Sequence, residues 1–148
     1  MTDTLEAHLK FPDNQRCWQL ILAAMFVLLA LIAFWPTPVD QPVSGQLASV
    51  LQFVHSNGVP GWFNYRLVEA SANIALFVPL GFVSRFAFVG KPLWQIGAFG
   101  LLVSGSIELG QLLFLHNRFA SLSDILMNTT GTIIGALLAA ILRSHPET

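Results

Sequence analysis

The stretch that decides the fold class is Cys17–Trp35, CWQLILAAMFVLLALIAFW, which contains no charged residue. A transmembrane helix needs about 20 consecutive, mostly apolar residues, and this stretch is long enough. Trp18 and Trp35 stand near its two ends, where aromatic side chains favour the membrane–water interface. Pro36 follows at once and disfavours any continuation of the helix. We therefore predict that this stretch crosses a membrane.

A secretory signal peptide is the alternative for this stretch, because Lys10 and Arg16 precede it. The apolar run exceeds the roughly 7–15 residues of a signal-peptide core, and no convincing small-residue cleavage site follows it. We therefore expect an uncleaved membrane anchor.

Composition indicates that the rest of the chain has the same character. Of its 148 residues, 54% are hydrophobic and 10% are charged, whereas soluble domains carry about 25% charged residues. Three further apolar segments predict spans at Val68–Val89, Leu93–Leu115 and Asp124–Arg143. The sequence thus predicts an all-α membrane protein, a bundle of four transmembrane helices. No basic stripe or aromatic motif supports nucleic-acid binding.

The predicted organisation has four parts: an N-terminal segment at 1–16, a first span at 17–35, an outer segment at 36–67, and a core at 68–148. The core holds the spans at 68–89, 93–115 and 124–143 and a short tail. Within the outer segment, four apolar residues at helical spacing predict a short helix lying along the membrane interface. These residues are Leu47, Val50, Leu51 and Val54.

Orientation follows from the basic residues that flank the spans, because cytoplasmic loops carry the excess of Lys and Arg. With the N-terminus inside, five basic residues are cytoplasmic: Lys10, Arg16, Arg85, Lys91 and Arg143. Only Arg66 and Arg118 are then outside. We therefore predict that both termini are cytoplasmic.

This orientation brings polar residues of three spans to one depth near the outer membrane surface, because they lie within two or three helical turns of the outer ends. The residues are Glu69 and Asn73 in the second span, Glu108 and Gln111 in the third, and Asp124 and Asn128 in the fourth. Arg118 lies in the outer loop directly above them. The sequence therefore predicts a polar site at the outer end of the bundle.

Residues three and four apart share one face of a helix, and polar and small residues follow this spacing. The three predicted stripes are Glu69, Asn73, Phe77, Gly81 and Ser84; Gly97, Gly100, Ser104, Glu108 and Gln111; and Asp124, Asn128, Gly131 and Gly135. Small residues on the inner half of such a stripe allow close helix packing. The spacing therefore predicts that these three faces meet in the bundle.

Three motifs in order resemble the VanZ-like family of small bacterial membrane proteins. They are NIALFVPLGF (Asn73–Phe82), SIELGQ (Ser106–Gln111) and the closing pattern from Arg118 through Asp124 and Asn128 to Gly135. The resemblance implies a location in the bacterial cytoplasmic membrane and a role at the cell envelope, including lowered sensitivity to lipid-targeting glycopeptides such as teicoplanin. It implies no known reaction.

Three interpretations of the polar residues remain open. In the first, they bind a lipid head group or a lipid-linked cell-wall precursor, with Arg118 contacting phosphate. In the second, the protein is an enzyme that modifies an envelope lipid or glycan, with Glu108 or Asp124 as general acid or base. In the third, the residues only join helices, as buried amides in membrane proteins often do.

Metal or cofactor chemistry has little support in the sequence. His116 stands beside the polar residues and could join Glu108 or Asp124 at a metal ion, but no specific metal-ligand spacing accompanies it. We therefore predict no metal and no cofactor.

Overall fold

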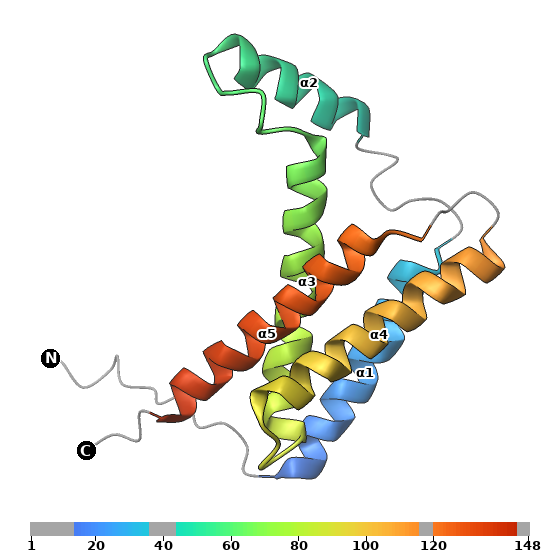
Figure 1. Ribbon diagram of the computed structural model, residues 1–148, viewed down its shortest axis with the longest axis vertical. Coiled ribbons are helices and arrows are strands. Elements are labelled where there is room, and N and C mark those ends of the chain that lie inside the picture. The colour runs from blue at the N-terminus through green and yellow to red at the C-terminus, as the bar shows by residue number, and fades with distance from the viewer. Residues whose placement is uncertain (1–13, 36–43, 116–119, 145–148) are drawn as a thin grey trace, which may run out of the picture.

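The computed structural model describes residues 14–35, 44–115 and 120–144. Within these residues the chain forms helices and no strands (Figure 1). The helices are α1 (Gln15–Ala33), α2 (Ser44–Ser56), α3 (Tyr65–Ala87), α4 (Leu93–Phe114) and α5 (Leu122–Ser144). All but α2 are long and apolar enough to cross a membrane. The predicted all-α architecture with four membrane-length helices is confirmed.

Polar caps set where three of these helices begin. The side chains of Asn14, Asn64 and Ser121 each accept a hydrogen bond from a backbone N–H of the following turn, at 3.0, 3.2 and 3.2 Å respectively. Such caps satisfy donors that have no partner within the helix. As a result α1, α3 and α5 begin two or three residues before the apolar runs from which the spans at 17, 68 and 124 were predicted.

The most extensive helix interface joins α3 and α5, which cross in the centre of the molecule (Figure 1). Gly131 and Gly135 of α5 lie against the backbone carbonyls of Ile74 and Val78 of α3. The residue numbers of these contacting pairs increase in the same direction along both helices, so α3 and α5 run parallel. A Cβ atom at either glycine would overlap α3 backbone, so the absence of a side chain permits this approach.

The fourth helix, α4, packs antiparallel to α5. Gly100 of α4 lies against the side chain of Thr132, and further along α4 the side chain of Ser104 is bonded to the earlier Asn128 of α5. The first helix, α1, packs mainly on α3, where Trp18 stacks on Phe86 with ring centroids 4.5 Å apart.

The first turns of α3 stand apart from the bundle. Every buried residue of α3 lies between Phe77 and Ala87, and none lies between Tyr65 and Leu76. Figure 1 shows the first turns of α3 rising beyond the other long helices towards α2. The long helices are therefore packed together at one end, whereas at the other, diverging end α3 leaves the remaining three.

The first turn of α1 and the last turn of α5 lie at the tightly packed end. Gln15 Nε2 donates a hydrogen bond to the Ala87 carbonyl at 3.0 Å, and the Arg143 guanidinium lies 5.7 Å from the centroid of the Phe86 ring.

Among the described elements, α2 contacts only α3 and exposes Val50 and Phe53. A short helix is thus present after the first span, and its placement along the membrane interface stays a prediction.

Candidate functional site

One stripe of α4 supplies three of the six buried polar residues in the described part of the chain. The residues of this helix that are buried are Ile96, Gly97, Gly100, Ser104, Glu108 and Gln111. All but Ile96 belong to the stripe predicted from the sequence, because three- and four-residue spacing keeps them on one face. The small residues occupy the tightly packed end, and the polar residues occupy the diverging end.

Asn128 of α5 and Ser104 of α4 form a buried polar pair. Asn128 Nδ2 donates to Ser104 Oγ at 2.9 Å, and both residues are buried. Asn128 Oδ1 is also buried, and no group in the described part of the chain hydrogen-bonds to it. Turning the amide over would only exchange which of its two atoms is unpaired. The pair therefore retains one unused hydrogen-bonding position, and leaving a buried polar group unsatisfied costs about 1–3 kcal/mol.

Glu108 fixes the start of α5. Its side chain is only 4% exposed, and Oε2 accepts a hydrogen bond from the Ser121 backbone N–H at 2.7 Å. Ser121 in turn caps α5 by accepting the N–H of Asp124. In a capping box the acidic residue at the third helical position takes the N–H of the capping residue. Here Glu108 of another helix takes it instead.

Asp124 is consequently the more available of the two carboxylates. It lies in the first turn of α5 and is partly exposed. Over residues 14–35, 44–115 and 120–144, no donor to its carboxylate is found. The positive end of the α5 dipole favours a negative charge at this position.

Gln111 joins the same end of α4 to α1. Gln111 Nε2 donates to the Ala33 carbonyl at 2.8 Å, one of the carbonyls in the last turn of α1 that accept no hydrogen bond within the helix. One residue earlier, the Phe34 ring covers Gly110, where a Cβ atom would lie 2.6 Å from the ring. Gln111 therefore binds α1 beside the polar groups of α4 and α5.

The structure brings together four of the seven predicted site residues, Glu108, Gln111, Asp124 and Asn128. Asn73 is half-buried and Glu69 is exposed, both on the diverging half of α3. The predicted depth alignment therefore groups α4 and α5 but does not bring Glu69 into their packed polar face. Arg118 and His116 lie outside the described residues. In the part of the chain that the structure describes, no group of three potential metal ligands is found.

Two serines that the prediction did not assign to the site are essential to its geometry. Ser104 is bonded to Asn128, and Ser121 links Glu108 to the start of α5. The sequence contained a signal for each. Ser104 stands four residues before Glu108 on the same face, and Ser121 is a preferred residue type directly before a helix.

We expect Glu108→Ala to lower the free energy of unfolding by about 1–3 kcal/mol, because it leaves the Ser121 N–H at the start of α5 without its acceptor. Glu108→Gln is the matched control, since its amide oxygen still accepts the Ser121 N–H. Thermal unfolding in detergent measures both. Equal melting temperatures for Glu108→Ala and the wild type would contradict this role for Glu108.

Comparison with known proteins identifies the family. Residues 20–143 match the family model described as VanZ/LLP1; this range includes most of α1, all of α3 and α4, nearly all of α5 and the polar residues described above. No curated protein and no solved structure gives a match. The chain belongs to the VanZ-like family and is a VanZ-like membrane protein.

Proposed function

We propose that this protein binds the head group of a lipid or a lipid-linked cell-wall precursor at the diverging end of the bundle. The observation that carries the proposal is the buried amide of Asn128, which has an unused hydrogen-bonding position one helical turn from the Asp124 carboxylate. A purely structural bridge needs no unused position. A ligand that reaches this amide would supply the missing hydrogen bond.

The chemistry of these groups suits a polar head group. The Asp124 carboxylate accepts hydrogen bonds from hydroxyl or ammonium groups, and the Asn128 amide bonds to sugar or peptide groups. Arg118, outside the described residues, is the proposed contact to phosphate, because guanidinium groups bind phosphate through two parallel hydrogen bonds. Glu108 acts indirectly, by holding Ser121 and the start of α5 in place.

The divergence of α3 from the other long helices supports entry of a lipid head group to this site laterally, from within the bilayer. Asn73 stands one residue before Ile74, whose carbonyl lies against Gly131 of α5. Asn73 is therefore within about one turn of the depth of Asn128, given a rise of 1.5 Å per residue. It lies on the half of α3 that carries no buried residue. A lipid head group would reach the site through this diverging side without leaving the bilayer.

The distribution of charge supports an outer-leaflet location for the site. The packed end carries Arg16, Arg85, Lys91 and Arg143, whereas Glu69, Glu108, Asp124 and only one described Lys or Arg, Arg66, lie towards the other end. Because basic residues favour the cytoplasmic side, we infer that both termini are cytoplasmic and that the protein resides in the bacterial cytoplasmic membrane. Alkaline phosphatase fused to the C-terminus is therefore expected to be inactive in cells. An active fusion would contradict this orientation.

We also propose that α2 lies along the outer membrane interface. Its described residues carry no Asp, Glu, Lys or Arg, and Val50 and Phe53 expose apolar surface. Lowered sensitivity to teicoplanin, the property for which the family is named, is the proposed consequence of binding an envelope lipid or precursor at this site.

Asp124→Asn tests the binding proposal with little disturbance of the fold. We expect it to lose most of the lipid retained through purification in mild detergent, while stability falls by no more than about 1 kcal/mol through the weaker helix-dipole interaction. Extraction of the purified protein followed by mass spectrometry measures the lipid. Ser123→Ala, an exposed change in the same turn, is the control. Unchanged lipid in Asp124→Asn would contradict a binding role for this carboxylate.

An enzyme that modifies an envelope lipid or glycan is the second candidate, and the availability of Asp124 favours it. Asp124 rather than Glu108 would be the general acid or base, because Glu108 is buried and accepts the Ser121 N–H. Expression of the wild type, but not of Asp124→Asn, would then change the chemical composition of envelope lipids. A bound lipid of unchanged composition would favour binding alone.

A further inference from the structure

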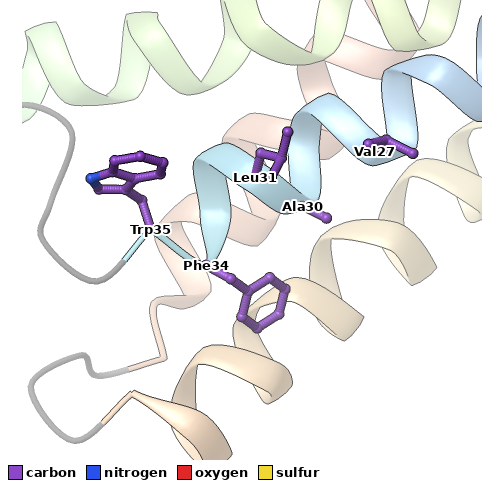
Figure 2. A pocket seen from close by; sticks show the side chains of 5 residues that line it. All are labelled: Val27, Ala30, Leu31, Phe34 and Trp35. Carbon is purple, nitrogen blue, oxygen red and sulfur yellow. The ribbon is translucent and has the colours of Figure 1, made fainter.

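The outward-facing side of α1 contains an apolar groove that the polar site does not include. Its volume is about 370 Å³, and it is lined by Val27, Ala30, Leu31, Phe34 and Trp35 (Figure 2). Val27, Leu31 and Trp35 are each more than half exposed. Ala30, the smallest of the five residues, leaves the space between its larger neighbours.

The groove follows the axis of α1. Its lining residues recur at three- and four-residue intervals, so they form one stripe over about two turns, or roughly 10–12 Å. Figure 2 shows Leu31 and Trp35 projecting from one side of α1 and Phe34 from the other, towards α4. A chain lying in this groove would run along the membrane span rather than across it.

One end of the groove lies beside Gln111, at the C-terminal end of α1. The Phe34 ring covers Gly110 of α4, and the adjacent Gln111 is bonded to the Ala33 carbonyl. Glu108 stands one turn before Gln111 on the same buried stripe. The groove therefore begins beside Gln111, one turn from Glu108, and continues away from it along the apolar part of α1.

We propose that this groove binds an acyl chain of the lipid whose head group occupies the polar site, which rests on the proposed function. All five lining residues are apolar, and the groove lies on a helix that is long and apolar enough to cross the membrane. An acyl chain is the partner whose chemistry and direction fit such a stripe.

Photolabelling tests this proposal. The full chain is reconstituted into phosphatidylglycerol vesicles that contain phosphatidylglycerol with a diazirine in the middle of one acyl chain, irradiated, and mapped by mass spectrometry. We expect label to concentrate in residues 27–35. Ala30→Trp fills the groove with an apolar side chain and is expected to remove most of that label. Ala98→Trp, at an exposed alanine of α4, is expected to leave it unchanged.

Each result bears on one proposal separately. Label spread equally over the exposed faces of α1, α4 and α5, or label in residues 27–35 that Ala30→Trp does not reduce, would overturn the groove. A dimer that dissociates in Ala30→Trp, with no label in the groove, would assign the face to a second copy of the chain and also overturn it. If Asp124→Asn loses bound lipid while the groove stays unlabelled, the head-group site stands and only the groove fails. If the groove is labelled but Asp124→Asn retains its lipid, the head-group site fails.

Discussion

Gly135→Ala is expected to lower the free energy of unfolding by about 2–3 kcal/mol, the upper part of the usual range for overpacking. A single methyl group has this effect because it would overlap the Val78 carbonyl and lie 2.8 Å from the Phe82 amide nitrogen. Both atoms belong to the backbone of α3, so no side-chain rotation relieves the overlap. The α3–α5 crossing would have to widen, and the polar site beside it would lose its packing.

Gly105→Ala is the matched control for this substitution. Gly105 lies inside α4, and a Cβ atom there would meet nothing within 4 Å. Alanine is also the better helix former by about 1 kcal/mol. We therefore expect Gly105→Ala to be neutral or slightly stabilising. Size-exclusion chromatography after heating in detergent compares the two variants, and equal stability would contradict the proposed importance of the crossing.

The periodicity of the sequence predicted the buried face of α4 because a straight helix fixes which residues share a side. Ser104, Glu108 and Gln111 are buried on that face as spacing requires. The lengths of the apolar runs predicted the four membrane-length helices, because a helix needs about 20 mostly apolar residues to cross a bilayer. Three of these helices begin earlier than predicted, because a polar cap such as Asn64 starts the helix before its apolar run.

The position of Glu69 was less predictable, because the sequence gives depth along a helix but not the angle between helices. Gly131 and Gly135 allow α3 and α5 to approach at one crossing, beyond which the outer half of α3 diverges. Glu69 therefore lies exposed on the diverging half although its distance from the helix end resembles that of its supposed partners. Helix crossing angles depend on how the two surfaces fit together.

The hydrogen-bond partners that join different helices at the site could not be predicted from the sequence either. Glu108 was expected to need a partner, and spacing alone could not indicate that the backbone N–H of Ser121 provides one. The same holds for the pairing of Asn128 with Ser104, which joins residues 24 positions apart. Such contacts depend on the rotation and height of two packed helices, which a single amino-acid sequence does not specify.

The binding site itself is tested most directly by removing the buried pair while preserving its packing. In Ser104→Ala/Asn128→Leu, both partners become apolar, and such paired replacement of a buried hydrogen bond is nearly neutral or stabilising. The matched control is Ser106→Ala/Thr130→Val, which changes exposed hydroxyls on the same two helices. The double variant should therefore fold but offer no amide to a ligand.

The measurement is native mass spectrometry of the wild type and both double variants, released from the same mild detergent after their melting temperatures have been compared. We predict that the wild type and Ser106→Ala/Thr130→Val carry a bound lipid and that the folded Ser104→Ala/Asn128→Leu variant loses it. Wild-type lipid occupancy in Ser104→Ala/Asn128→Leu would contradict the account, because the Asn128 amide would then contribute only to helix packing.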